Sequence, residues 1–306
     1  MNTDNKRRCA MLGAALLVLT VTAFGQTTWT NMAGGDWTTG VNWDNDVPDG
    51  NFAYLTNATA SYTVTFNGPA PVVSNLSISN SVGYLTTLEI TNGLLLSSNS
   101  VPGIRYLTTP SISLGNNTRL NINTNGQLYN WSSALGIGSN AVVQINGGSL
   151  TNRGMLLMLK GSTLIVNSGD LALYYIPRVG YVTYSGGFST QEAVMVVNGG
   201  KVYARASGAS GFNIGYVGVG RLVINNGEMY HRSSGINDYL NVGFGQSAYN
   251  APGTARGFID VYGGVFTNEV PLYLGRHAKA NTSCGEGYVL VAGGRLVQSK
   301  DIILKA

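Results

Sequence analysis

The chain has 306 residues and a formal net charge of +4, and only 10% of its residues are charged, against about a quarter in typical globular proteins. Its 8 prolines and 44% hydrophobic residues exclude a collagen-like or proline-rich disordered chain. With 42 glycines and abundant asparagine, the composition favours many short strands joined by Gly/Asn turns over an ordinary globular enzyme.

Residues 1–25 have the features of a secretory signal peptide. A positive segment at 6–8 precedes an uncharged segment at 10–24, and small residues at the −3 and −1 positions predict cleavage before Gln26. The uncharged segment is shorter than the about 20 residues of a membrane span, and an uncleaved anchor is the alternative. Cleavage removes three cations and one carboxylate, which lowers the net charge from +4 to +2. That charge gives no reason to expect a nucleic-acid partner.

We therefore expect a secreted, extracellular or cell-surface protein with no membrane span after signal removal. Of the cysteines, only Cys284 would survive cleavage, so no intrachain disulfide can form. Stability then has to come from packing and from hydrogen bonds between strands.

An internal repeat runs through most of the chain after the signal. An apolar-x-apolar pattern is followed by glycine and, two residues later, by another apolar residue. Alternation with period 2 places the apolar residues on one face of a strand, and the glycine step permits a sharp turn into the next strand. The eight copies have their glycines at Gly93, Gly126, Gly148, Gly169, Gly200, Gly227, Gly264 and Gly294.

A second element, apolar-x-apolar-Gly, precedes most copies of this repeat. Examples are Ile112–Gly115, Leu135–Gly138, Leu157–Gly161 and Phe212–Gly215. A unit of two or three short strands cannot close a core alone, whereas stacked units can. The sequence predicts an all-β chain that forms a parallel β-helix, or β-solenoid, of about eight irregular coils. A β-sandwich or propeller is the alternative, but either would favour hairpin turns and steadier spacing.

Asparagines recur at equivalent turn positions, namely Asn146, Asn167, Asn198 and Asn225. In register, such side chains can hydrogen-bond along a stack. Alternatively, each asparagine only tolerates a left-handed turn conformation.

Residues 26–68 lack the repeat and contain Trp29, Trp37 and Trp43, followed by Pro48. This tryptophan- and proline-containing opening, before glycine-rich repeats, resembles the bacterial autotransporter-associated β-strand repeat proteins of the type found in Verrucomicrobia and Planctomycetes. The resemblance implies a passenger-like β-helix at or outside the cell surface and carries over no catalytic residues. The chain lacks the C-terminal membrane barrel of a full autotransporter, so we expect ordinary signal-dependent export.

The Trp-rich segment has two interpretations. Exposed indoles would stack on sugar rings, whereas buried indoles would cap the open end of a solenoid core. Its position favours the cap, and we divide the chain into a signal peptide (1–25), a Trp-rich N-terminal capping segment (26–68) and solenoid repeats (69–306).

The sequence predicts no catalytic site and no cofactor. Hydrolysis of a glycan usually needs two facing carboxylates, but the carboxylates are scattered over different repeats. Asp260 is the best single candidate, although we expect it to be a solvated residue on a strand face. His231 and His277 lie in different repeats.

One acidic segment could hold a metal ion. Asp44, Asp46 and Asp49 lie within six residues and are candidate calcium ligands. They lack the spacing of an EF-hand, and Asp/Pro/Gly is also ordinary turn chemistry.

Three connections between the second element and the next repeat are longer than the others and should emerge on one side of the solenoid. They form a candidate binding face for a glycan or another cell-surface polymer, or are unselected surface loops. The predicted face contains Tyr181, Tyr184, Tyr249, Arg256, Arg276, His277 and Lys279.

Ile302–Leu304 occupies the place of another second element, which suggests head-to-tail self-association through an open coil. Together these features predict a secreted or cell-surface β-solenoid with a structural, adhesive or extracellular-matrix role and no catalytic chemistry. The alternative is a polysaccharide-binding or polysaccharide-degrading β-helix.

Overall fold

The computed structural model describes residues 25–56, 59–69, 72–80, 83–97, 110–131, 134–182, 190–206, 211–233, 238–245, 255–276 and 285–304. The predicted signal peptide up to residue 24 lies outside the described residues. So do Tyr184, Tyr249, His277 and Lys279 of the predicted binding face.

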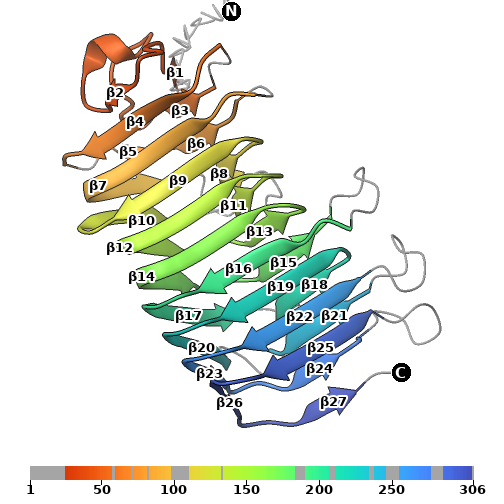
Figure 1. Ribbon diagram of the computed structural model, residues 1–306. Helices are drawn as coiled ribbons and strands as arrows, with labels where there is room; N and C mark the ends of the chain where they lie inside the picture. The colour runs from red at the N-terminus through yellow and green to blue at the C-terminus, as the bar shows by residue number, and fades with distance from the viewer. Residues whose placement is uncertain are drawn as a thin grey trace, which may run out of the picture.

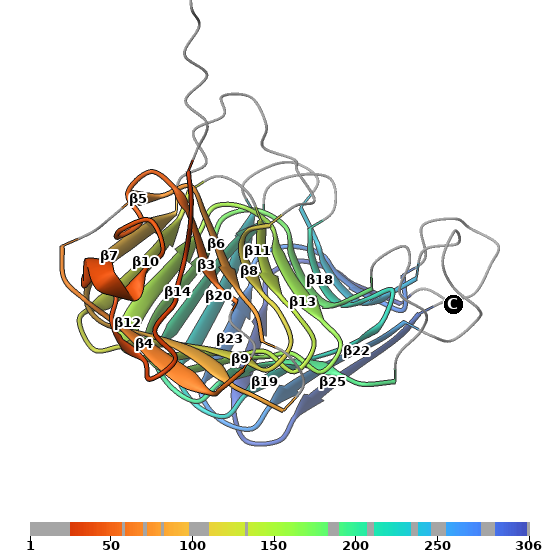
Figure 2. The same cartoon turned by 90° about the horizontal axis from the view of Figure 1, so that it is seen from above.

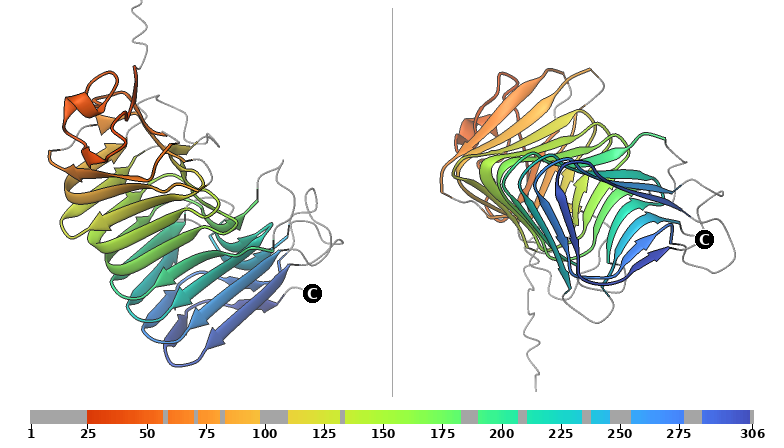
Figure 3. Two further views of the ribbon diagram at one scale, coloured as in Figure 1. Left: turned by 45° about the horizontal axis from the view of Figure 1, so that its top comes forward. Right: turned by 60° about the horizontal axis from the view of Figure 1, so that its bottom comes forward.

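The described chain is a stack of coils made of two long parallel sheets (Figure 1). Seen from above, successive coils superpose around a common interior (Figure 2). The first and last coils lie at opposite ends of the stack (Figure 3). This architecture confirms the predicted parallel β-solenoid.

The first sheet contains one strand from each coil. Its 11 strands follow one another in chain order, and every pairing is parallel. They are β1 (Gln26–Thr28), β3 (Phe52–Leu55), β6 (Asn75–Ile78), β8 (Pro110–Leu114), β11 (Ala134–Ile137), β13 (Leu156–Leu159), β15 (Pro177–Tyr181), β18 (Phe212–Tyr216), β21 (Leu240–Phe244), β24 (Leu272–Leu274) and β27 (Ile302–Leu304).

The second sheet has 16 strands and contains the other two segments of each coil. In some coils the two segments are separate strands, and in others one long strand continues through both. The strands are β2 (Gly35–Asp36), β4 (Tyr62–Asn67), β5 (Val72–Val73), β7 (Thr86–Ser97), β9 (Thr118–Asn123), β10 (Gly126–Asn130), β12 (Val142–Asn152), β14 (Thr163–Leu173), β16 (Ala193–Val197), β17 (Lys201–Ala206), β19 (Val219–Ile224), β20 (Glu228–Ser233), β22 (Arg256–Val261), β23 (Val265–Asn268), β25 (Glu286–Val291) and β26 (Arg295–Gln298).

The core consists of the apolar residues of the repeat, stacked in register. Equivalent residues pair from coil to coil, and those ahead of the last coil are fully buried. One such column contains Val64, Leu88, Leu120, Val143, Leu164, Met195, Leu222, Ile259 and Val289.

One copy of the second element has a different register from the predicted one. Leu157 and Leu159 were expected to point inward, but the core cluster contains Leu156 and Met158, whereas Leu157 is buried outside that cluster and Leu159 is partly exposed. Met158 pairs with Ile137 of the preceding coil. Since alternate residues face opposite sides of a strand, the tetrapeptide Leu-Leu-Met-Leu offers two inward faces, and stacking on β11 selects the one with methionine.

The Trp-rich segment covers the N-terminal end of the core. Trp29 and Trp37 are fully buried and Trp43 is 5% exposed. The ring of Trp43 packs edge-on against Trp29 at 5.1 Å and against Trp37 at 4.7 Å between centroids, and Trp37 contacts Phe66. A short 3-10 helix, η1 (Gly40–Asn42), connects the second and third indoles. Buried indoles support the capping interpretation and oppose the exposed sugar-stacking one.

The stack already includes the last residues assigned to the capping segment. Strand β4 pairs in parallel with β7, with Val64 opposite Leu88 and Phe66 opposite Ile90. Strands β4, β5 and β6 therefore form a coil ahead of the eight that carry the predicted glycine.

Glycine in the second element permits a close crossing of backbones. Gly215 has φ +75°, and an added Cβ would overlap the carbonyl oxygen of Arg256 at the start of β22. Gly180 and Gly243 have the same conformation and lie against the carbonyl oxygens of Val219 and Glu286. A side chain at these positions would separate the two sheets where they meet.

The predicted asparagine stack is present on the outside. The amide of Asn167 donates to Asn146 at 2.8 Å, that of Asn198 to Asn167 at 2.8 Å, and that of Asn225 to Asn198 at 2.8 Å. Asn123 extends the ladder by one coil.

A second polar column lies inside the corner between β20 and β21. Buried Asn130 donates to Asn152 at 2.6 Å, and His231 occupies the equivalent place three coils further along. The Nδ1 of His231 lies 2.6 Å from Oδ1 of Asn268, and its buried Nε2 has no hydrogen-bond partner in the described part of the chain. Burial lowers the pKa of His231 from 6.5 to about 4.

The crossing of backbones predicts that Gly215→Ala is strongly destabilising. Gly50 has a similar φ of +69° but open space around it, so Gly50→Ala is the matched control. We expect a loss of about 1 kcal/mol in the free energy of unfolding for the control, from backbone strain alone, and of at least about 3 kcal/mol for G215A. Urea denaturation measures both, and equal losses would contradict the steric role of the crossing.

The buried imidazole predicts a loss of stability in acid. Because the folded-state pKa of His231 lies below its unfolded value, the free energy of unfolding is at its full value above pH 6.5 and decreases as the pH falls towards about 4. The full loss is roughly 3 kcal/mol. His231→Asn introduces the residue type that Asn152 has at the equivalent position, and it should remove this pH-dependent loss of stability. Denaturation of both proteins at about pH 7.5 and about pH 4.5 checks the difference, and identical pH dependence would refute it.

Candidate binding surface

Aromatic and arginine side chains form two parallel columns on the outside of the second sheet. The register pairs Asn130, Asn152, Leu173, Ala204 and His231 in turn, so the residue after each occupies an equivalent place in five successive coils. We call these two columns the aromatic–arginine face. It consists of Trp131, Arg153, Tyr174, Arg205 and Arg232 in the first column and of Tyr129, Tyr203 and Tyr230 in the second, where Thr151 and Ala172 separate Tyr129 from Tyr203.

One arginine of the face lies between two exposed aromatic rings. The Cζ atom of Arg153 is 4.5 Å from the ring centroid of Trp131 and 5.4 Å from that of Tyr174. The two rings are 51% and 40% exposed. Cation–π contact holds the guanidinium plane in one orientation while leaving its edge accessible.

The tyrosine column adds flat ring surface beside the arginines. Tyr203 and Tyr230 stack at 5.6 Å with 13° between their planes, and Tyr129 stacks on Trp131 at 5.5 Å. The hydroxyl of Tyr230 donates to Glu228 at 3.1 Å, and this hydrogen bond is the main reason why the pKa of Tyr230 is raised. Tyr230 therefore remains neutral near pH 7.

Most of the positive charge on this face has no carboxylate partner. Arg232 lies 3.4 Å from Glu269, whereas Arg153 and Arg205 make no ion pair within the described part of the chain. Exposed aromatic rings combined with cations that lack a carboxylate partner in the described chain are typical of a binding site rather than of an inert strand face.

Our sequence reasoning missed the aromatic–arginine face, although its signal is present. In five successive copies, the fifth residue after the repeat glycine is Trp, Arg, Tyr, Arg and Arg. The column becomes visible when the repeats are aligned on that glycine and the outward positions are compared.

Three residues of the predicted loop-side face are described. Tyr181 and Arg276 follow the glycines of their second elements, and the register places Tyr216 and Phe244 between them. Arg256 lies at the start of β22 and pairs with Glu286 at 3.0 Å. The structure thus brings Tyr181 and Arg276 into one column, and the remaining four residues lie outside the described chain.

Two arginines near this column, Arg178 and Arg276, are largely covered by rings. Arg178 lies 4.3 Å from the centroid of Tyr216, and Arg276 lies 4.1 Å from Tyr239 and 4.7 Å from Tyr273. The Nε of Arg178 and an Nη of Arg276 are buried and have no hydrogen-bond partner among the described residues. These guanidiniums mainly pack the outside of the first sheet.

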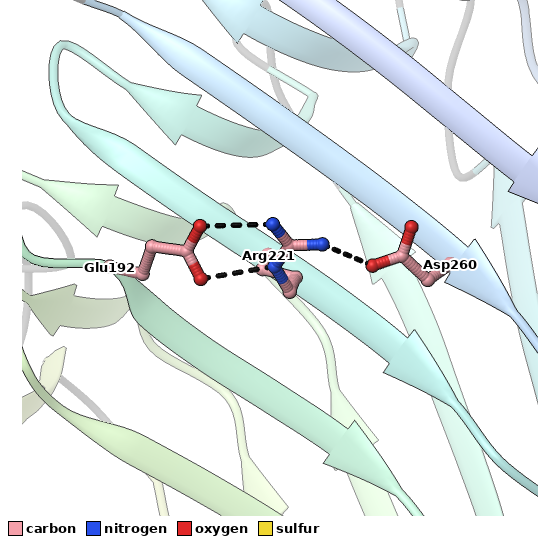
Figure 4. A network of polar contacts seen from close by, with 3 residues as sticks. All are labelled: Glu192, Arg221 and Asp260. Atoms are coloured by element: carbon pink, nitrogen blue, oxygen red, sulfur yellow. Dashed lines mark hydrogen bonds and ion pairs between the residues drawn. The ribbon is translucent and has the colours of Figure 1, made fainter.

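Asp260 belongs to an ion-pair network (Figure 4). Arg221 on β19 donates twice to Glu192, at 3.0 Å each, and once to Asp260 on β22. The hydrogen bonds to Glu192 are the main reason why the pKa of Arg221 is raised. Asp260 is only 6% exposed, so the expectation of a solvated strand residue was wrong. The residues that pair with Asp260 on the adjacent strands, Val223 and Leu290, are apolar. The buried carboxylate therefore needs a cation such as Arg221 to compensate its charge.

The candidate calcium ligands make backbone contacts instead of converging. Asp44 accepts from the amide of Thr28 at 2.6 Å, and Asp46, with φ +65°, accepts from the amide of Val47 at 2.8 Å. Among the described residues, no group of three or more His, Cys, Asp or Glu side chains could hold a metal ion.

A hollow of about 320 Å³ lies at the turns before β7, β9 and β12. Its lining includes Tyr84, Asn117, Arg119 and Asn140. These residues belong to other corners of the coils than the aromatic–arginine face, so the hollow is a separate feature.

The comparisons add no relative. No family model, no curated protein and no solved structure matches the chain. The described residues also contain no helix with the length and apolarity that a membrane crossing needs.

The ion-pair network around Arg221 predicts a large loss of stability when only the cation is removed. Arg221→Met leaves Asp260 buried without a partner and should cost about 2–3 kcal/mol of unfolding free energy. The double variant R221M/D260L replaces the pair with apolar groups and should recover most of that loss. Chemical denaturation of the three variants, including D260L alone, gives the coupling energy, and additive losses would contradict the pairing.

Proposed function

We propose that this protein is a secreted or cell-surface β-solenoid that adheres to an extended extracellular polymer through the aromatic–arginine face. The observation that supports the proposal best is the placement of Trp131, Arg153 and Tyr174 on three successive coils with their rings exposed. Sugar rings have apolar C–H faces that pack well on indole and phenol rings.

The shape of the stack supports an elongated ligand. Successive strands are separated by 4.7–4.9 Å, so five coils present a straight row of contacts of about 19 Å. A row of this kind suits a polymer lying along the solenoid axis better than a small molecule, which would need a concave pocket.

We propose an adhesive or extracellular-matrix role rather than an enzymatic one. The two carboxylates closest to a paired arrangement, Glu192 and Asp260, are both held by Arg221. Their hydrogen bonds to Arg221 occupy oxygens that a catalytic acid or base would need to reach a substrate. The expected export and the resemblance to autotransporter-associated repeat proteins fit this role, and both remain proposals.

The proposal predicts that the two flanking rings of Arg153 are needed for adhesion. Trp131→Ala and Tyr174→Ala should each weaken binding to immobilised polysaccharides by about tenfold without changing the thermal midpoint. Tyr262→Ala removes an equally exposed ring, 49% exposed, that lies outside the face, and should leave binding unchanged.

A polysaccharide array probed with the purified protein measures this directly. Unchanged binding by W131A and Y174A, or an equal loss for Y262A, would exclude the face as the adhesive surface. Shortening of any polysaccharide on the array would instead favour the degrading alternative.

A further inference from the structure

We propose that the polymer bound by the aromatic–arginine face is an anionic polysaccharide, whose carboxylate or sulfate groups bind Arg153, Arg205 and Arg232. This inference rests on the proposed function and specifies the chemical class of its ligand.

The order of side chains along the first column matches such a polymer. From coil to coil the column presents indole, guanidinium, phenol and two further guanidiniums. An acidic polysaccharide likewise alternates apolar ring faces with single anionic groups. The rings would pack on sugar faces while the cations meet the acidic substituents.

The two arginines at the end of the column repel each other in the free protein. Arg205 and Arg232 are directly opposite in the register of β17 and β20, and like charges in that arrangement destabilise a strand pair. Within the described chain, Glu269 pairs with Arg232 alone. An anion placed between the two guanidiniums would relieve this repulsion, which is a specific reason to expect one there.

Arg153 is preorganised for the same kind of ligand. Its stacking on Trp131 and Tyr174 at 4.5 Å and 5.4 Å fixes the plane of the guanidinium. A planar guanidinium donates from its edge to two oxygens of a carboxylate or sulfate at once. Because the side chain is already ordered, binding costs less conformational entropy.

The charge density of the face favours a polysaccharide over a nucleic acid. Duplex DNA carries one charge per about 1.7 Å of its length, far denser than one guanidinium per one or two coils. After the expected signal cleavage the chain carries a net charge of only +2, whereas nucleic-acid-binding domains are usually strongly basic. A polysaccharide with one charge per sugar matches the spacing of the guanidiniums on the face more closely.

The test compares pairs of polymers that differ only in charge. Polygalacturonate is paired with its fully methyl-esterified form, and dextran sulfate with dextran, with single-stranded DNA as a further arm. We expect the protein to bind at least one anionic member at least about tenfold more tightly than its neutral partner. Binding should weaken as salt is raised.

Variants separate this inference from the proposed function. Arg153→Gln and R205Q/R232Q should each lower affinity for the anionic polymer by about tenfold, with circular dichroism unchanged. Lys160→Gln, an exposed cation at another corner, is the matched control, and Arg153→Lys should recover little because lysine cannot stack or donate in a plane.

Each remaining outcome has a definite meaning. Equal binding of charged and neutral partners through Trp131 and Tyr174 would overturn the anionic ligand but leave the adhesive face intact. Tighter binding to single-stranded DNA than to either anionic polysaccharide, or no binding to any of the four polysaccharides, would overturn the inference.

Discussion

The parallel, in-register stacking of equivalent strands is the constraint on which the rest of the structure depends. Because each strand pairs with the same strand of the next coil, side chains at paired positions lie above one another at a separation of 4.7–4.9 Å. A single position of the repeat therefore becomes a column that runs through successive coils. A property that is kept from coil to coil at such a position, as in the apolar core and the asparagine ladder, is repeated at the same spacing.

Polar columns show how strict this constraint is. Outside the stack, Asn146, Asn167 and Asn198 each accept a hydrogen bond from the next coil. Inside it, a position that is asparagine in three coils, as Asn130, Asn152 and Asn268, is histidine in another, and burial favours the neutral imidazole of His231. An ionisable side chain enters a buried column only when its charge is removed, or is paired as in Asp260 with Arg221.

Much of the fold could be predicted from the sequence because period-2 alternation and glycine positions determine a coil directly. The repeat glycines, the core residues and the Asn ladder were found in this way. The register of β13 was not, because Leu-Leu-Met-Leu is apolar on both faces and only contact with Ile137 chooses between them.

The site was harder to predict because its residues share a position and not a residue type. Trp131, Arg153 and Tyr174 differ in chemistry and lie 22 and 21 residues apart in the chain, so no local motif connects them. The long connections instead pointed to Tyr181 and Arg276, whose column consists mainly of aromatic rings, with Arg276 packed against Tyr239 and Tyr273. An exposed binding surface on a solenoid is found by comparing the outward-facing residues at equivalent positions of successive coils.

A crystal structure of the protein with an acidic oligosaccharide of four to six sugars would test the central claim most directly. The account predicts that the oligosaccharide lies along the solenoid axis across β10, β12, β14, β17 and β20, with sugar faces on Trp131 and Tyr174 and an anionic group at Arg153. An oligosaccharide bound across the loop-side column between Tyr216 and Arg276, with the aromatic–arginine face free, would contradict it.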